Sequence, residues 1–224
     1  MCARLTLLLL VVLAPRMAWA QEISLHASYM GGSRILTAPR ALNAIERNGT
    51  NDFHASLSAG AALRLDVSTS TAVELSIEYA PMQSHFADHH GTPFSDGYDV
   101  AAIELAGIFT LPVSSRTVSM YVGGGAGFYA GTRSLSVAGI SARSIMQPPA
   151  FGILTLIGVR YAFLPSLAAT FEWRFRNPQL GAENVYDQSS VTHKGVTYPL
   201  PTDPFYSRIN LNGNVFRLGV GWVF

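Results

Sequence analysis

The sequence predicts an all-β protein, an eight-stranded antiparallel up-and-down transmembrane β-barrel. Three observations predict it. Apolar and polar residues alternate with a period of two along much of the chain, the alternating segments number eight, and the connections between them are long and short in turn. Tight turns at one end and long loops at the other are typical of barrels in a bacterial outer membrane, with both chain termini on the periplasmic side.

A targeting segment precedes the first strand. Arg4 provides a short positive region, residues 5–13 form an apolar run with one threonine in it, and residues 18–20 read Ala-Trp-Ala. The run is too short to span a bilayer, and the Ala-Trp-Ala sequence is typical of a cleavage site. We therefore expect residues 1–20 to be a secretory signal peptide.

Cleavage between Ala20 and Gln21 would leave residues 21–224 as a single barrel domain. The only cysteine, Cys2, would leave with the signal, which excludes a disulfide, a thiolate metal site and a cysteine nucleophile. The chain is 49% hydrophobic, 13% charged and has a formal net charge of +1. It lacks the basic surplus that nucleic-acid binding requires, and we expect no nucleic-acid partner and no cofactor.

The strands follow from the alternation. Val73, Leu75 and Ile77, for example, alternate with Glu74 and Ser76, which places apolar and polar side chains on opposite faces of a strand. The eight predicted strands lie near residues 22–30, 53–67, 72–80, 99–111, 117–131, 151–163, 167–176 and 209–224. The long connections are then 31–52, 81–98, 132–150 and 177–208, and the short ones are 68–71, 112–116 and 164–166.

The cost of charge in lipid decides which face points outward. Every backbone polar group must be paired in hydrocarbon, so the strands must close into a barrel. An arginine or lysine on the lipid face costs about 2–4 kcal/mol near the midplane, so the apolar face points outward. A soluble lipocalin-like barrel, with apolar residues inside, is the alternative. Aromatic residues near both strand ends favour the membrane barrel: Tyr161, Phe163, Trp222 and Phe224 at the turn ends, and Tyr29, Phe53, Tyr79 and Phe151 near the loop ends.

Inward-pointing charges are the first candidate site. An eight-stranded barrel is just wide enough for side chains to fill it, and acids and bases are both present, so we expect ion pairs to fill the lumen. A selectivity ring in a narrow pore is the alternative, and it would favour one sign of charge. We place Glu78, Glu104, Glu172, Arg174 and Arg217 in one cluster at mid-barrel, and Arg64, Asp66, Glu74 and Arg160 nearer the periplasmic end.

Three glycines share one face of the fifth predicted strand. Gly123, Gly125 and Gly127 lack the GxGxxG and GxxxxGK[ST] spacings of phosphate-binding loops, and no helix follows them. Small inward residues are better explained as space for Tyr121, Tyr129 and arginines opposite.

The second long connection is rich in possible metal ligands: His85, Asp88, His89, His90, Asp96 and Asp99. His85 and His89 would share a face on a helical turn, but Gly91 and Pro93 argue against a long helix. A solvated loop is the simpler interpretation, and metal binding by His85, His89 and His90 stays open.

Two His-x-Ser pairs are candidate catalytic groups. His26 and Ser28, like His54 and Ser56, share a strand face. Lipid A deacylases of the same barrel class use a His-Ser-acid set, but here the pairs point inward, away from an acyl chain in the membrane, and no acid is evident to orient the histidine. We therefore expect no catalytic residues.

The last nine residues carry a resemblance. Phe216, Leu218, Val220, Trp222 and Phe224 alternate with Arg and Gly up to a terminal aromatic residue. This segment resembles the terminal strand of bacterial outer-membrane barrels, which is read by the barrel-assembly machinery in that family. Residues 121–129 and 158–163 also resemble strands of the small OmpA-, OmpX- and opacity-protein-like group. No peptidoglycan-binding tail of the OmpA type is expected.

The resemblance implies a monomeric barrel in the outer membrane of a Gram-negative bacterium, with membrane lipid and the assembly machinery as partners. The group includes anchors, adhesins, small pores and enzymes. We expect a filled barrel with a structural role or a surface-interaction role, binding an unknown extracellular ligand through its four long loops. A narrow, porin-like pore for ions or small solutes and an outer-membrane lipid-modifying enzyme are the alternatives.

Overall fold

The computed structural model describes residues 21–31, 33–37, 50–52, 55–113, 115, 117–211 and 213–224. The expected signal peptide lies outside these residues, and so do Phe53 and His54. Within the described ranges no helix is long and apolar enough to cross a membrane.

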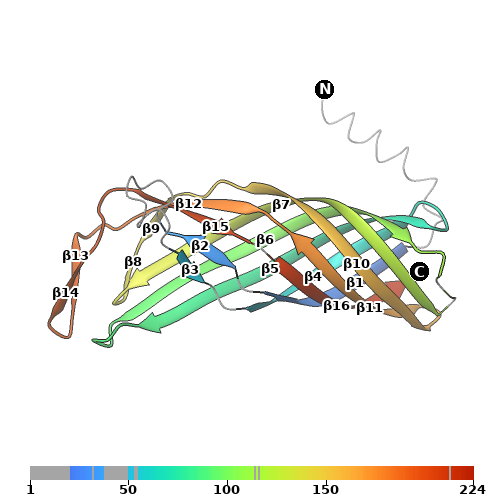
Figure 1. Cartoon of the computed structure of the whole chain (residues 1–224), viewed down its shortest axis with the longest axis horizontal. Helices are drawn as coiled ribbons and strands as arrows, with labels where there is room; N and C mark the ends of the chain where they lie inside the picture. Colours follow the sequence, from blue (N-terminus) through green and yellow to red (C-terminus); the bar gives the residue numbers. More distant parts are fainter. Residues whose placement is uncertain are drawn as a thin grey trace, which may run out of the picture.

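Eight antiparallel strands form a closed barrel (Figure 1). Each strand pairs with the next along the chain, and the last pairs with the first, so the sheet has no free edge. The predicted fold class is confirmed, and each predicted strand corresponds to one barrel strand. The barrel strands are β1 (Gln21–Met30), β4 (Ser56–Asp66), β5 (Thr71–Ala87), β6 (Pro93–Thr110), β7 (Val118–Val137), β10 (Ala150–Leu164), β11 (Leu167–Arg176) and β16 (Gly213–Val223).

In the part of the barrel nearer the short turns, apolar side chains point outward and charged side chains point inward. Leu25 and Leu218 are 69% and 64% exposed on the outer surface, whereas Glu104 and Arg174 are each 1% exposed. Lipid hydrocarbon can cover this outward apolar band without burying an unpaired charge.

Three strands are longer than predicted. β5 runs to Ala87, β6 begins at Pro93 and β7 runs to Val137, where strand ends were expected at residues 80, 99 and 131. β5 and β6 remain paired up to Ala87 and Pro93, so the predicted connection at 81–98 is mostly a hairpin rather than a loop.

The strands are longer because the alternation continues above this height with polar residues on the outer face and apolar residues on the inner face. On β5, Glu78 is the last inward charge, and Ala80 and Met82 are the next inward residues. The outward residues change at the same height, from Tyr79 to Gln83. Apolar outward side chains are stable against lipid, and polar outward side chains are stable against water. The extracellular edge of the lipid-facing band therefore lies near Ala80.

The other five barrel strands are interrupted near this height and continue in short strands. These pair in the order β3-β2-β15-β12-β9, which repeats the order β4-β1-β16-β11-β10 of their barrel continuations. Prolines occur at two of the breaks, at Pro178 and at residues 148–149, where each removes a backbone donor. The short strands are β2 (Arg34–Leu36), β3 (Thr50–Asp52), β9 (Arg143–Met146), β12 (Gln179–Val185) and β15 (Phe205–Asn210).

The predicted long connections at 31–52, 132–150 and 177–208 therefore contain strands, where loops were expected. β8 (Ile140–Ser141) pairs with the end of β7. β13 (Ser190–His193) pairs with β14 (Val196–Pro199) to form a separate hairpin. Figure 1 shows this hairpin as the far tip of the molecule.

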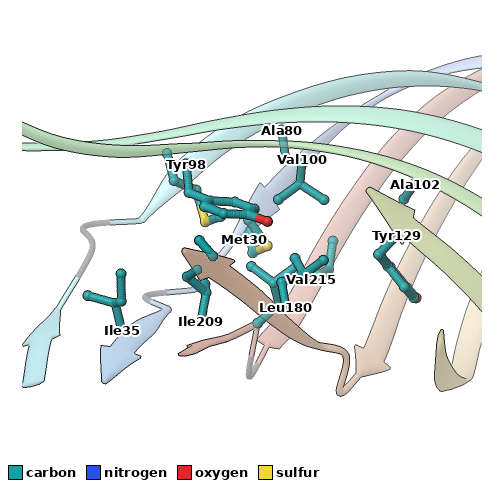
Figure 2. Packing of buried hydrophobic residues seen from close by; sticks show 13 residues of the cluster. Met30, Ile35, Ala80, Tyr98, Val100, Ala102, Tyr129, Leu180, Ile209 and Val215 are labelled. Atoms are coloured by element: carbon teal, nitrogen blue, oxygen red, sulfur yellow. The ribbon is translucent and has the colours of Figure 1, made fainter. Parts of the chain in front are cut away.

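The five-stranded sheet faces the extensions of β5, β6 and β7 across a core of apolar side chains (Figure 2). We call this core the apolar cluster. Leu180 and Ile209 from the sheet lie against Tyr98 and Val100 from β6. The cluster consists of Met30, Ile35, Ala80, Met82, Tyr98, Val100, Ala102, Tyr129, Leu180, Ala182, Ile209, Leu211 and Val215.

Candidate functional site

Charged side chains fill the lumen within the membrane part of the barrel. They come from β4, β5, β6, β11 and β16, on the inward face that the alternation predicts. We call the set the charge cluster: Arg64, Glu74, Glu78, Glu104, Glu172, Arg174, Arg176 and Arg217. The structure brings together all five residues predicted at mid-barrel and adds Arg64, Glu74 and Arg176.

Arg217 occupies the centre of the charge cluster. Its Nη2 lies 3.1 Å from Glu78 Oε2 and 3.8 Å from Glu104 Oε2. Its Nη1 lies 3.5 Å from Glu74 Oε1 and 3.6 Å from Glu172 Oε2. Arg217 therefore points into the lumen, within ion-pair distance of four carboxylates.

Arg174 joins three of the same carboxylates. Its Nε donates to Glu172 Oε2 at 2.7 Å, its Nη1 donates to Glu104 Oε2 at 3.1 Å, and its Nη2 contacts Glu74. Because each carboxylate is shared between two arginines or more, the cluster is one network rather than a set of separate pairs.

Arg176 is a member that the sequence reasoning missed. Its Nη2 donates to Glu78 Oε1 at 2.7 Å, and its Nη1 donates to Glu104 Oε1 at 3.1 Å. Tyr129 donates its hydroxyl to the same Glu104 oxygen at 2.8 Å. The signal was available, because Arg176 follows Glu172 and Arg174 on the inward face of β11.

The predicted separation of Arg64 and Glu74 from the mid-barrel set is wrong. Arg64 Nη2 donates to Glu74 Oε2 at 2.8 Å and to Glu172 Oε1 at 3.4 Å, and its guanidinium lies 4.6 Å from the ring centroid of Tyr121. Strands of a barrel tilt, so the count of residues from a turn is a poor measure of height. Long arginine side chains also reach past the position of their own backbone.

Asp66 and Arg160 do lie at the periplasmic mouth. Arg160 Nε donates to Glu22 Oε2 at 2.8 Å, and Asp66 is solvent-exposed. Both line a polar cavity of about 350 Å³ that also reaches Arg64 and Tyr121. This mouth ends at the charge cluster, and a cavity of about 10 Å³ lies beside the cluster.

The charge cluster contains four arginines and four glutamates. Buried charges are tolerated when they are paired and hydrogen-bonded, and equal numbers leave no net charge to compensate. The geometry suits a rigid polar core and does not favour one sign of ion, as a selectivity ring would.

Of the three inward glycines of β7, Gly127 makes room for an aromatic ring, whereas Gly123 lies against the Gly107 carbonyl oxygen and the aliphatic Leu156. A Cβ on Gly127 would lie 2.7 Å from the hydroxyl oxygen of Tyr129, and one on Gly123 would lie 3.2 Å from Leu156. Tyr121 in turn lies over Gly158 and donates its hydroxyl to Glu172 Oε1 at 2.7 Å.

The first His-x-Ser pair does not form a catalytic arrangement. Ser28 Oγ donates to Glu78 Oε2 at 3.2 Å, and His26 Nε2 lies 3.8 Å from the same oxygen. A nucleophile would have to bond to the histidine base, whereas here serine and histidine both face a carboxylate. His54, from the second pair, is outside the described residues.

The histidines of the β5–β6 hairpin are spread along it. His85 lies in strand β5, with Nε2 3.3 Å from Gln83 Oε1, so it does not share a helical turn with His89. The rings of His89 and His90 lie close together in the turn, with centroids 3.8 Å apart and planes tilted by 47°. Within the described ranges no three His, Cys, Asp or Glu residues are grouped as metal ligands.

Asp96 was predicted in a solvated loop and is instead buried. Arg133 donates from Nε to Oδ1 at 3.0 Å and from Nη2 to Oδ2 at 2.7 Å, and its Nη1 donates to Ser207 Oγ at 2.8 Å. This bidentate pair lies among the extended hairpins, on the inward faces of β6 and β7. Asp96 and Arg133 are 37 residues apart, and only the strand register brings them together.

The terminal strand closes the barrel against β1. Ile23 pairs with Trp222 and Leu25 with Val220, so the last strand lies between the first and β11. The five predicted residues of the C-terminal segment all have outward, exposed side chains: Phe216, Leu218, Val220, Trp222 and Phe224.

Comparisons with known proteins agree with this architecture. No protein-family model and no curated protein sequence matches the chain. The crystal structure of the outer membrane protein OprG from Pseudomonas aeruginosa superposes with a TM-score of 0.68 at 12% identity, covering 93% of this chain and 97% of that one. Lower similarity is found with AlkL (TM-score 0.47, 12% identity, 92% and 90% coverage) and with Ail of Yersinia pestis (0.46, 12%, 93% and 100%). The chain shares the fold of a small eight-stranded outer-membrane β-barrel.

Proposed function

We propose that this protein is a non-conducting outer-membrane barrel that displays a structured extracellular β-sheet domain to a partner at the cell surface. The outward apolar band and the fold shared with OprG support the membrane location. The proposal assigns the protein a structural and binding role rather than a transport role.

One observation carries the proposal: the barrel interior is filled at two consecutive levels. The charge cluster occupies the lumen within the membrane, and the apolar cluster occupies it just above. An ion entering from the periplasmic mouth meets paired charges and then a core of buried apolar side chains. Neither level offers the row of hydrated sites that conduction requires.

The extracellular part is built as a fixed surface. The Tyr198 hydroxyl donates to Asp88 Oδ2 and accepts a hydrogen bond from Thr92 Oγ1 at 2.8 Å, which ties the β13–β14 hairpin to the turn after β5. The ring of Phe94 packs edge-on against Tyr198, with centroids 5.9 Å apart. A pre-organised surface binds a partner with less loss of conformational entropy than mobile loops would.

Single-channel recording in planar bilayers tests the filled lumen. At neutral pH the inserted wild-type protein should give no steady open channel, whether or not potential is applied. The comparison variant is Arg176→Ala, which removes one guanidinium from the charge cluster. Replacing all eight residues of the cluster by alanine would be uninformative if that protein failed to fold. A reproducible ohmic open state of the wild-type protein would contradict the proposal and favour the narrow pore.

We also propose that the terminal strand directs assembly. Its backbone closes the barrel against β1, and its outward apolar side chains cover the lipid-facing side of that seam. Replacing Trp222 and Phe224 by serine should leave export intact and block insertion, as reported by heat-modifiable migration on gels. A doubly substituted protein that still folds and resists proteolysis in the membrane would exclude this role.

A further inference from the structure

His26 is a buried titratable side chain that the filled lumen does not use. It is 6% exposed, and neither ring nitrogen has a hydrogen-bond partner among the described residues. Its ring lies over Gly60 of β4, where a Cβ would come within 2.5 Å of Nε2. The nearest carboxylate oxygen is Glu78 Oε2, at 3.8 Å.

Charges surround His26 from every strand that packs against it. They include both signs, and within the charge cluster four arginines balance four glutamates, so a neutral imidazole leaves the balance intact. The facing groups are Glu22 on β1, Arg64 on β4, Glu74 and Glu78 on β5, Glu172 and Arg174 on β11, and Arg217 on β16.

The carboxylate nearest to His26 is already fully engaged. Glu78 accepts hydrogen bonds from Arg176, Arg217, Ser28 and Ser58. A charged imidazolium would therefore have to compete for Glu78 Oε2 with the Arg217 Nη2 group, which lies 3.1 Å from it.

Polar residues line a route toward His26 from the periplasmic mouth. The cavity of about 10 Å³ beside His26 has room for about one water. It shares Glu22 and Arg64 as lining residues with the periplasmic mouth. On the opposite side the lumen is filled by the apolar cluster, so protons reach His26 from the periplasm.

We propose that His26 is a proton-binding site reached from the periplasmic mouth, and that its protonation loosens the charge cluster. This inference rests on the proposed filled lumen and adds regulation to it. A proton from water in the small cavity binds a ring nitrogen of His26. The imidazolium then donates to Glu78 Oε2 and displaces an Arg217 hydrogen bond, leaving five cations against four anions in the network.

The size of the effect follows from linkage. In a loosened, hydrated lumen the imidazole is in contact with water, where a histidine side chain protonates near pH 6.5. The population of the loosened state should then rise about tenfold for each pH unit below that value. The charge cluster should be tight at pH 8 and measurably open at pH 5.5.

The test uses a reporter cysteine at Ser24, which lines the small cavity and makes no ion pair. The Ser24→Cys change is made in the full chain with Cys2→Ser, and the protein is folded into lipid vesicles. The probe is a small neutral methanethiosulfonate, and its rate of reaction is measured at pH 8 and pH 5.5. The same measurement is made with His26→Gln added, and with His85→Gln as the matched control in the extracellular part of β5.

Thiolate reactivity falls as the pH is lowered in every background, so the quantity compared is the ratio of rates at one pH. Between wild-type His26 and His26→Gln this ratio should be near one at pH 8 and about tenfold at pH 5.5. The His85→Gln variant should follow the wild-type residue. Equal rates in the two His26 backgrounds at pH 5.5 would overturn the proposal.

Fast labelling at pH 8 in every background would instead show that the lumen is not filled, which is failure of the proposed function rather than of the switch. Should His26→Gln not fold, the histidine ring resonances of the unsubstituted protein provide the second measurement. The His26 ring should titrate over the pH range in which Ser24→Cys becomes reactive. A His26 ring that titrates without any change in reactivity would also overturn the proposal.

Discussion

Two levels of the same barrel interior are filled by opposite kinds of side chain. Within the membrane the lumen holds buried ion pairs such as Arg174 with Glu104, while the level above holds apolar residues such as Leu180 and Ile209. The difference is set by what lies outside the wall. Within the membrane the outer face of each strand contacts lipid and is apolar, and the polar residues point into the lumen. Above the membrane the outer face contacts water and is polar, and the apolar residues point inward.

A single strand carries both arrangements. In β5 the inward residues Glu74 and Glu78 belong to the charge cluster, and Ala80 and Met82 belong to the apolar cluster. The backbone stays paired with β6 throughout. The side-chain pattern alone therefore marks the membrane boundary, and each prediction below changes one side of this contrast.

Breaking the charged level should have the largest effect. Arg174→Ala removes a guanidinium that contacts three carboxylates and leaves them buried with fewer partners. The free energy of unfolding should fall by about 3–5 kcal/mol. Equilibrium unfolding by denaturant in lipid vesicles measures it. Arg160→Ala, which removes a partly exposed pair, is the matched control and should cost about 0–1 kcal/mol. Equal losses in both would mean that the lumen is hydrated.

Breaking the apolar cluster should lower the free energy of unfolding by nearly as much, but the loss should fall on the five-stranded extracellular sheet. Leu180→Ala leaves a cavity in a fully buried core and should destabilise the five-stranded sheet by about 2–5 kcal/mol. Hydrogen exchange should show protection lost in β12 and β15 and retained in β5 below Ala80. The exposed Val113→Ala change should stay within about 0.5 kcal/mol. Uniform loss of protection through the barrel would show that the two levels unfold together.

Placing charge on the outer face should sharpen the boundary. Leu75→Arg puts a cation on the lipid face of β5 and should cost about 2–4 kcal/mol of folding free energy. Gln83→Arg is the matched control on the same face of the same strand above the boundary, and it should stay within about 0.5 kcal/mol. Denaturant unfolding of the two variants compares them. A cost at Gln83 equal to that at Leu75 would move the boundary outward.

The smallest effect concerns the extracellular tip. The hydrogen bond from Tyr198, assisted by the backbone N–H groups of Thr92 and His90, lowers the pKa of Asp88 to about 2. Because the folded-state pKa is lowered, the stabilisation of the hairpin contact is complete above pH 4 and is lost as the pH falls through 2. Tyr198→Phe should raise the pKa of Asp88 toward 3.8, as followed by NMR titration of its carboxyl carbon. An unchanged titration would exclude the hydroxyl as the cause.

Much of the barrel was predictable because period-two alternation specifies both a strand and its faces. The inward placement of Glu172 and Arg217 follows from that pattern alone, and their contact follows from the pairing of β11 with β16. The heights of Arg64 and Glu74 could not be predicted by counting residues from a turn, since strand tilt enters the height.

The extracellular sheet was missed for a physical reason. The lipid-facing pattern stops before the strands do, and the alternation continues with polar residues outside and apolar residues inside, as in Thr132, Ser134 and Ser136 outside and Leu135 and Val137 inside on β7. A search for alternation of either sign would have found the longer strands. The short strands such as β2 contain three residues, too few for periodicity to identify.

The central claim is that the faces of β5 exchange their environments near Ala80. Spin labels placed singly at Leu75, Ile77, Gln83 and His85 test it most directly, through their collision rates with oxygen dissolved in lipid and with a water-soluble nickel complex. The account predicts lipid-like collisions at the first two positions and water-like collisions at the last two. Lipid-like collisions at Gln83 and His85 would contradict it, because the apolar cluster would then lie within the membrane.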